Sequence, residues 1–289
     1  MTHTVPDLPF ATEAHVAVGI DGTETSLHAV RWAVDEAGKR AVPLLIVHAA
    51  PYAAGAAGAL RAHAGRILGR AYTVAHRRNP ALAVHTARLD ADPAVALVEI
   101  AGRADLVVLG MPGDGQVGSG GSVALRVAAH ATGAVAVVHS GDQEAPAGPV
   151  VAGIGDPHTD AGVVAVAHAF ARRRRAPLHV VHVAHSARDA AHARDLLEPL
   201  TARWAERDTG VPVAVHVVHG RPLPVLIERA VGALLLVVGP AKGGLRGMLG
   251  STSRALLRAA PCPVVVTGHS DVQPAGGPAR DPHARAELW

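Results

Sequence analysis

The sequence predicts an α/β protein built from two tandem Rossmann-like domains, each with a parallel sheet covered by helices on both faces. Short segments rich in Val, Leu and Ile alternate with longer helix-like segments along the whole chain. The expected strands are apolar on both faces, which is typical of parallel strands buried between two helical layers. The same alternation occurs twice, and this repetition predicts the two domains.

Each copy contains five apolar runs that predict strands and four longer segments that predict helices. In the first copy we expect strands near 15–21, 43–49, 82–88, 105–110 and 134–139, and helices near 24–40, 56–78, 92–103 and 121–131. In the second copy we expect strands near 149–155, 177–183, 211–218, 233–238 and 262–267, and helices near 159–175, 186–209, 222–231 and 250–259. The connections between successive parallel strands should be right-handed.

Landmark residues recur at two offsets, which identifies the repeat as a duplicated domain. Pro43 and Pro177 open matching strands 134 residues apart, whereas Gly110 and Gly239 end matching strands 129 residues apart. The second copy has therefore lost five residues around its second helix and third strand. A unit of roughly 130 residues is large enough for one hydrophobic core and too long for a solenoid repeat.

The composition shifts where domains are expected to end. Residues 140–148 are polar, and they predict a short linker. The segment 269–289 is rich in Gly, Pro, Asp and Arg without periodicity, and it predicts a disordered tail. We therefore expect one domain at 1–143 and a second at 144–268.

The overall composition is that of a soluble globular protein, with 289 residues of which 49% are hydrophobic and 18% charged. No uninterrupted apolar run approaches the roughly 18 residues of a membrane span, and the N-terminus lacks the features of a signal peptide. The single Cys262 cannot form an internal disulfide, and its apolar surroundings predict a buried thiol. These features predict a cytoplasmic protein without a membrane partner.

The basic residues give no sign of a nucleic-acid partner. The formal net charge is +3, and the one basic cluster, Arg172–Arg175, ends a predicted helix, where cations interact well with the helix dipole. Its alternative role, a patch for nucleic acid or an acidic partner, lacks interleaved aromatic residues. We expect a solvated helix end.

The nineteen histidines raise the question of a metal site. His179, His182 and His185 are spaced by three, as are His216 and His219. On a strand this spacing places neighbours on opposite faces, which is poor geometry for ligands of one ion. We expect surface or strand-edge histidines and no metal site.

A glycine-rich loop follows the fourth strand of the first copy and leads into a helix. It contains Gly110 and Gly113 and ends at Gly121 and Ser122. Glycines allow backbone N–H groups to approach a phosphate closely, and free amides at a helix N-terminus favour an anion. The alternative is a flexible connection followed by an ordinary serine cap.

The second copy has an equivalent loop between Gly239 and Gly250. Lys242 stands where the first copy has Gly113, and three hydroxyl side chains, Ser251, Thr252 and Ser253, open the next helix. Two such loops at corresponding places favour an anion-binding role.

Asp21 ends the first expected strand and should face the loop that starts at Gly110. In a parallel sheet, ligands bind beyond the carboxyl ends of the strands where the strand order reverses. A carboxylate there accepts hydrogen bonds from a ribose or an adenine edge. The alternative is a turn residue, because Asp-Gly-Thr is also a good turn and capping signal.

These features together resemble the tandem universal stress proteins. The residues that carry the resemblance lie at 16–22, 43–48, 104–110, 121–130 and 250–266, within two similar stretches at 14–140 and 149–267. The resemblance implies five-stranded parallel sheets of strand order 3-2-1-4-5. It also implies pairing of domains or chains through the last strands and, in many members, ATP binding.

The resemblance implies a nucleotide site in each copy, with the fuller one in the first. The implied contacts are Gly19, Asp21, Ala49, Leu109, Gly110, Gly113, Gly121, Ser122 and Val123 in the first copy, and Gly239, Gly250, Ser251, Thr252 and Ser253 in the second. Nucleotide-binding members carry Gly, two residues, Gly, nine residues, then Gly-Ser. Both loops of this chain are two residues shorter, and the second copy has Gly155 where the first has Asp21.

The leading functional hypothesis is a stress-response regulatory protein that binds an adenine nucleotide, ATP with or without Mg²⁺, and acts through an unidentified protein partner. One alternative is a nucleotide-free member of the family that binds a partner. Another is a slow ATPase, although the sequence contains no Walker loop, kinase motif set or nucleophile elbow.

Overall fold

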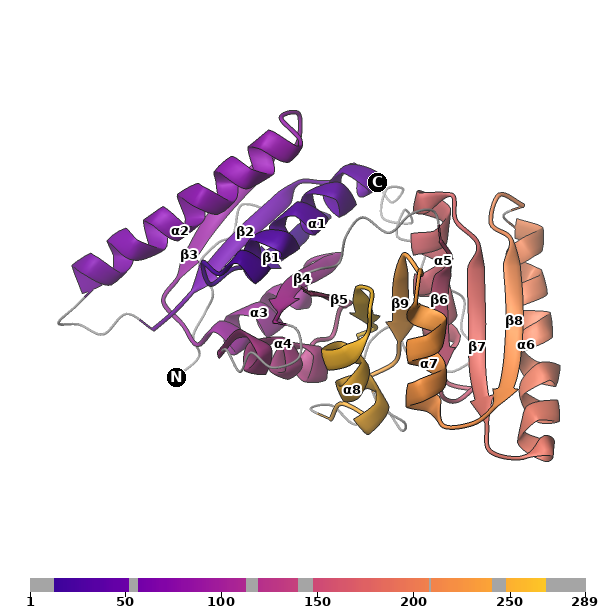
Figure 1. The fold of residues 1–289 in the computed structure, drawn as a ribbon. Helices are drawn as coiled ribbons and strands as arrows, with labels where there is room; N and C mark the ends of the chain where they lie inside the picture. The colour runs from indigo at the N-terminus through magenta and orange to yellow at the C-terminus, as the bar shows by residue number, and fades with distance from the viewer. Residues whose placement is uncertain are drawn as a thin grey trace, which may run out of the picture.

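The two halves of the chain form a single ten-stranded sheet in the computed structural model (Figure 1). The structure describes residues 13–51, 57–112, 119–139, 148–207, 209–240 and 248–268. The predicted tail at 269–289 and all of the predicted linker except Gly148 lie outside these residues. In the described part of the chain, no helix has the length and hydropathy needed to cross a membrane.

Strands and helices alternate in both halves as predicted. The first half contains β1 (Val16–Gly19), α1 (Glu24–Arg40), β2 (Leu44–Ala49), α2 (Ala57–Arg78), β3 (Val84–Leu89), α3 (Pro93–Ala101), β4 (Leu106–Met111), α4 (Ser119–His130) and β5 (Val135–His139). The second half contains β6 (Val150–Ile154), α5 (Ala161–Arg174), β7 (Leu178–Ala184), α6 (Ala187–Arg207), β8 (Val213–His219), α7 (Pro222–Ala230), β9 (Leu235–Val238), α8 (Ser251–Ala259) and β10 (Val264–Val266).

The strand order is β3-β2-β1-β4-β5-β10-β9-β6-β7-β8, so each half has the implied order 3-2-1-4-5. All pairs within a half are parallel. The two halves meet through their last strands, where β5 and β10 pair antiparallel with Val137 opposite Val264. The predicted fold and the pairing of the two domains are therefore confirmed.

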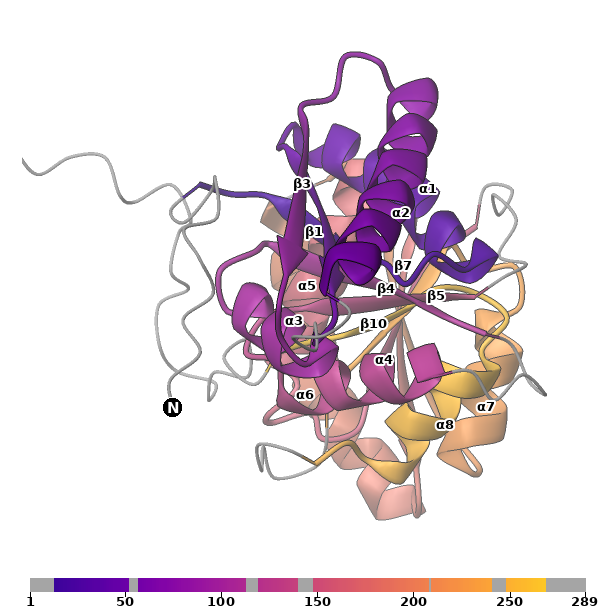
Figure 2. The ribbon, with the colours of Figure 1, turned by 90° about the vertical axis from the view of Figure 1, so that its left-hand side faces the viewer.

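Helices cover both faces of the sheet. Figure 2 shows α1 and α2 on one side of the first half and α3 and α4 on the other. One apolar cluster joins the sheet to α3, α4, α7 and α8, and another joins its opposite face to α1, α2, α5 and α6. Each cluster contains residues from both halves, because the joined sheet gives them a common surface. Cys262 is buried, as expected.

Capping residues define the ends of the helices. The Thr23 hydroxyl accepts a hydrogen bond from the Ser26 amide at the start of α1, and Asp92 accepts two from backbone amides at the start of α3. Ala41 ends α1 and Arg175 ends α5 in the left-handed conformation, with φ of 55° and 51°. Although glycine is the usual residue here, both copies use a side-chain-bearing residue at the same place.

Several histidines are buried, contrary to the expectation of surface and strand-edge positions. His48 and His182 occupy equivalent places near the ends of β2 and β7, and both are less than a tenth exposed. Nδ1 of His48 lies 2.8 Å from the Ile20 carbonyl oxygen, and Nδ1 of His182 lies 3.1 Å from that of Ile154. Each ring therefore hydrogen-bonds a carbonyl at the carboxyl end of the neighbouring strand, which accounts for its burial.

A buried ion triad connects α1 of the first half with α5 of the second. The fully buried Glu36 accepts hydrogen bonds of 2.6 Å from Arg40 and from Arg174. The Arg174 guanidinium also lies 5.7 Å from the centre of the Trp32 ring and 5.0 Å from that of Phe170. Burial alone raises the pKa of Glu36, but the two guanidinium groups outweigh it and lower the pKa below the ordinary 4.5.

We expect Glu36→Gln to destabilise the protein by about 3–5 kcal/mol at neutral pH, because it leaves two buried cations without their anion. Since the folded pKa is depressed, the stabilisation is present above the unfolded pKa and is lost as pH falls through the folded value. The difference between wild type and variant should therefore shrink below about pH 4. Denaturant unfolding of both proteins at several pH values measures this difference in the free energy of unfolding.

The matched control is Glu99→Gln, which removes an exposed pair with Arg103 on α3. It should change the free energy of unfolding by no more than about 0.5 kcal/mol. Equal effects of the two substitutions would contradict the importance of the buried triad.

Candidate functional site

A cavity of about 280 Å³ opens at the carboxyl ends of β1, β2 and β4, on the face covered by α3 and α4. This is where the strand order of the first half reverses, because β2 and β4 lie on opposite sides of β1. Its lining residues are Gly19, Ile20, Asp21, Thr23, Thr25, Ser26, Val47, Ala49, Pro93, Leu97, Leu109, Gly110, Pro112, Val123 and Ala124. Six of the residues predicted from the sequence lie among them: Gly19, Asp21, Ala49, Leu109, Gly110 and Val123.

Asp21 lies at the polar rim of this cavity and also holds a turn. Its Oδ1 accepts hydrogen bonds from the Thr23 amide at 3.0 Å and from the Thr23 hydroxyl at 2.6 Å. Asp21 is therefore a turn residue, as one of the two interpretations predicts, and it holds the turn through one of its carboxylate oxygens. The side chain is exposed and lines the cavity, so a ligand can reach the carboxylate.

Most of the cavity lining is apolar, and these residues form an apolar slot. Val47 and Ala49 from β2 and Leu109 from β4 form its walls together with Leu97 from α3. A Cβ atom at Gly19 would lie 2.6 Å from Cδ2 of Leu109 and 2.9 Å from Cδ1 of Leu97. Glycine at this position lets the two leucines pack over the end of β1. An apolar slot with a carboxylate at its rim suits a flat heteroaromatic ring that carries N–H donors.

Gly110 lets the end of β4 approach the first turn of α1. A Cβ atom there would lie 2.7 Å from the Thr25 carbonyl oxygen and 2.9 Å from its carbon, both rigid backbone atoms. The glycine is therefore required by a close backbone approach. Thr25 and Gly110 both line the cavity, so this contact forms part of its wall.

The predicted phosphate-binding residues lie at the start of α4, where one expectation needs correction. The helix begins at Ser119 and not at Gly121, so Gly121 and Ser122 lie within its first turn. The amides of the N-cap and of the first three helical residues have no partner inside the helix, so that of Gly121 belongs to this group, whereas that of Ser122 is the first to be used by the helix itself. Gly113 lies outside the described residues.

The second half differs from the first at the equivalent crevice. Gly155 replaces Asp21, and the turn moves to Asp156, whose Oδ1 accepts from the His158 amide at 2.9 Å. Asp160 stands where the first half has Ser26, and its Oδ2 accepts from the amides of Gly155 at 2.7 Å and Asp156 at 3.0 Å. These backbone donors are therefore already satisfied by an internal anion.

The remaining predicted residues of the second half are Gly239, which lies near the Asp160 carboxylate, and four residues at the start of α8. Gly250 caps α8, which begins at Ser251 as expected, with Thr252 and Ser253 in its first turn. The Ser253 hydroxyl donates to the Gly239 carbonyl at 2.9 Å and is buried. Its hydrogen is therefore not directed to a ligand. Val183 takes the place of Ala49 and makes that strand end bulkier.

Sequence reasoning missed the contributions of the helices that close the cavity. Thr23, Thr25 and Ser26 from the start of α1 and Pro93 and Leu97 from α3 all line it. The capping signals that mark both helix starts predict that these segments begin near the carboxyl edge of the sheet. Among the described residues, no three His, Cys, Asp or Glu side chains gather in a group that could hold a metal ion.

We expect Gly110→Ala to destabilise the protein by about 1–3 kcal/mol, because the new methyl group forces β4 and α1 apart. The change should also shift the part of the cavity wall that Thr25 and Gly110 form. Gly239→Ala is the matched control, since its Cβ would meet nothing closer than Asp160 Oδ1 at 3.5 Å, an ordinary contact. Thermal unfolding of both variants measures the difference, and equal melting temperatures would contradict the close approach at Gly110.

Comparison with known proteins identifies the family. The model of the universal stress protein family matches residues 14–139 and again 147–268. A universal stress protein of Mycobacterium tuberculosis is 35% identical over 288 residues, covering 88% of this chain and 97% of the relative. Another from Mycolicibacterium smegmatis is 33% identical over 289 residues, covering 89% and 97%.

The fold agrees with this assignment. A crystal structure of a universal stress protein from Archaeoglobus fulgidus superimposes with a TM-score of 0.72 at 16% identity, covering 88% of this chain and 98% of that one. The family match extends over both halves, and both halves have the same strand order. The chain therefore belongs to the universal stress protein family and contains two of its domains in tandem.

Proposed function

We propose that the first half binds an adenine nucleotide, with ATP as the preferred ligand, and that the protein acts as a stress-response regulator. The observation that carries this proposal is the cavity at the carboxyl ends of β1, β2 and β4, which combines an apolar slot with the Asp21 carboxylate at its rim. The adenine ring would enter between Val47, Ala49 and Leu109. Asp21 would accept hydrogen bonds from the ribose or the adenine edge.

The phosphates would extend toward the connection between β4 and α4. Amides at the start of a helix attract anions through unpaired N–H groups and the helix dipole. The Gly121 amide belongs to this group in α4, the Ser122 hydroxyl would be a further donor, and Gly110 at the end of β4 lines the cavity. A Mg²⁺ ion would accompany the phosphates as part of the ligand.

The second half should bind nucleotide weakly or not at all. Asp160 places a fixed negative charge on the amides at the end of β6, where it would repel a phosphate group. The second half also lacks a carboxylate at the position of Asp21 and has the bulkier Val183 in place of Ala49. One nucleotide per chain is the expected stoichiometry.

Binding would regulate the contacts of the protein with a partner rather than begin a reaction. Helix α1 extends from the cavity at Thr23–Ser26 to the buried triad at Glu36, so a ligand would contact the helix that joins the halves. The alternative in the enzyme class, slow ATP hydrolysis, requires a positioned water and usually a metal ion. A nucleotide-free partner-binding protein is the other alternative.

We expect Asp21→Ala to weaken ATP binding by about 10- to 100-fold, the usual effect of losing a hydrogen bond to a charged group. Isothermal titration calorimetry of the full chain with ATP measures the affinity and the stoichiometry. Asp156→Ala is the matched control, because Asp156 holds the equivalent turn of the second half. It should leave the affinity unchanged.

Three outcomes would count against the proposal. Absence of heat with ATP, ADP and cyclic AMP would favour the nucleotide-free alternative. Equal losses in the two aspartate variants would exclude a specific role for Asp21. Release of ADP in proportion to protein, abolished by Asp21→Ala, would favour the enzyme.

A further inference from the structure

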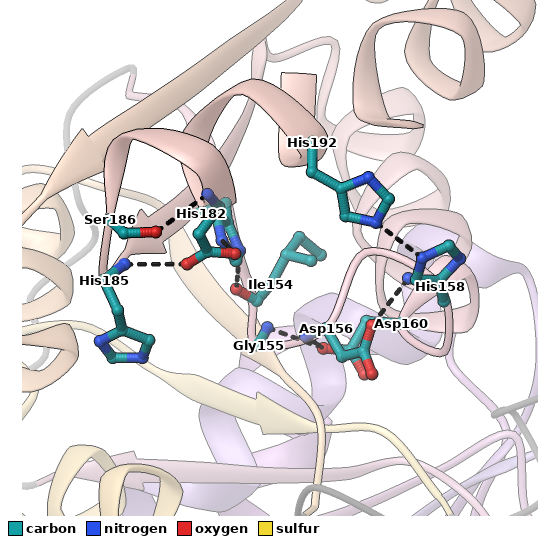
Figure 3. A network of polar contacts seen from close by, with 10 residues as sticks. Ile154, Gly155, Asp156, His158, Asp160, His182, His185, Ser186 and His192 are labelled. Atoms are coloured by element: carbon teal, nitrogen blue, oxygen red, sulfur yellow. Dashed lines mark hydrogen bonds and ion pairs between the residues drawn. The ribbon is translucent and has the colours of Figure 1, made fainter. Parts of the chain in front are cut away.

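Two histidines from separate elements of the second half meet ring to ring on the surface (Figure 3). His158 lies in the connection between β6 and α5, and His192 lies on α6. Their Nε2 atoms are 2.9 Å apart, the ring centres are 5.1 Å apart, and the planes are tilted by 45°. Both side chains are exposed. Two imidazole nitrogens from positions 34 residues apart therefore converge on one point that solvent can reach.

We propose that His158 and His192 form a chelating site for a borderline divalent metal ion, Zn²⁺ or Ni²⁺. Neutral imidazole is a preferred ligand of both ions, and it requires no charged partner. Without metal, the contact is an N–H···N hydrogen bond between one ring as donor and the other as acceptor. When the metal binds, the donor ring carries its proton on Nδ1 instead of Nε2, so that both rings stay neutral and both Nε2 atoms bind the ion.

The distance between the two nitrogens suits this exchange. With metal–nitrogen bonds of about 2.0–2.1 Å, two ligands are about 3.0 Å apart at a right angle and about 3.4 Å apart at a tetrahedral angle. The observed 2.9 Å is close to the first value and about half an ångström short of the second. Small rotations of the exposed rings, which point at each other in the hydrogen bond, turn both lone pairs toward the ion.

The backbone on both sides of the pair is already fixed. On one side, the His158 amide donates to Asp156, and Asp160 accepts from the amides of Gly155 and Asp156. On the other side, the Asp189 amide donates to the Ser186 hydroxyl at 3.1 Å. Because this order exists before the metal arrives, little conformational entropy is lost on binding.

The neighbouring charges favour a cation on the His158 side. Asp156 and Asp160 lie in the same connection as His158, as Figure 3 shows. On α6, Arg188 lies about one turn before His192 and Asp195 about one turn after it, so their opposite charges offset each other. Two protein ligands leave coordination positions for water, in keeping with the lack of three-residue metal groups among the described residues. This site lies in the opposite half from the proposed nucleotide cavity and is independent of it.

The test is a calorimetric titration of the full chain, freed of metal by a chelator, with ZnCl₂ and separately with NiCl₂. The chain contains nineteen histidines, so weak background binding is expected. The strongest site should weaken at least tenfold in His158→Ala and in His192→Ala. The double variant should lose no more than either single variant, because a chelate needs both rings. His130→Ala, which removes an exposed histidine of α4, should bind like the wild type.

A second measurement separates a metal site from a purely structural hydrogen bond. Zn²⁺ should raise the melting temperature of the wild type and of His130→Ala, because it binds the folded form. It should not raise that of either pair variant, and Mg²⁺, which prefers oxygen ligands, should have no effect on any of them. Identical Zn²⁺ isotherms for wild type and the two pair variants would overturn the proposal. So would additive losses in the double variant.

Discussion

The antiparallel pairing of β5 with β10 is the contact on which the rest of the structure depends. Each of these strands ends its own five-stranded sheet, and alone it would present a row of unpaired backbone N–H and C=O groups. Pairing satisfies them and joins two sheets into one of ten strands. Close contacts support the junction on both sides. His139 Nε2 lies 2.8 Å from the Leu257 carbonyl oxygen. The backbone at Gly268 packs so closely that a Cβ atom there would lie 2.1 Å from the Thr132 carbonyl oxygen.

The buried charges between α1 and α5 complement this junction. A buried carboxylate between two guanidinium groups is costly to separate from them, because each separated charge would stay buried without its partner. Glu36 belongs to the first half and Arg174 to the second, so their contact ties the two helices, and with them the two halves, together. Since α1 also begins at the cavity, the relative placement of the halves and the shape of the cavity depend on the same helix.

The alternation of strands and helices could be predicted from the sequence because buried parallel strands are apolar on both faces and give uninterrupted runs of Val, Leu and Ile. The glycines of the site, Gly19 and Gly110, could also be found, since they end strands in a repeated pattern. The helix side of the cavity, formed by Thr25 and Leu97, could not, because it depends on how helices pack on the sheet. Asp160 was missed because its carboxylate leaves the usual capping position and reaches back to Gly155. His158 and His192 were missed because only the fold brings them together.

The joining of two domains in one chain has a consequence for how their surfaces change in evolution. When two identical chains pair about a twofold axis, every substitution appears on both partners, so neither crevice can change alone. Here the equivalent positions are encoded separately. Ser26 can line a cavity in one half while Asp160 closes the equivalent crevice in the other, and His158 and His192 occur in one half only. The fused chain keeps the shared sheet and leaves each crevice free to acquire a chemistry of its own.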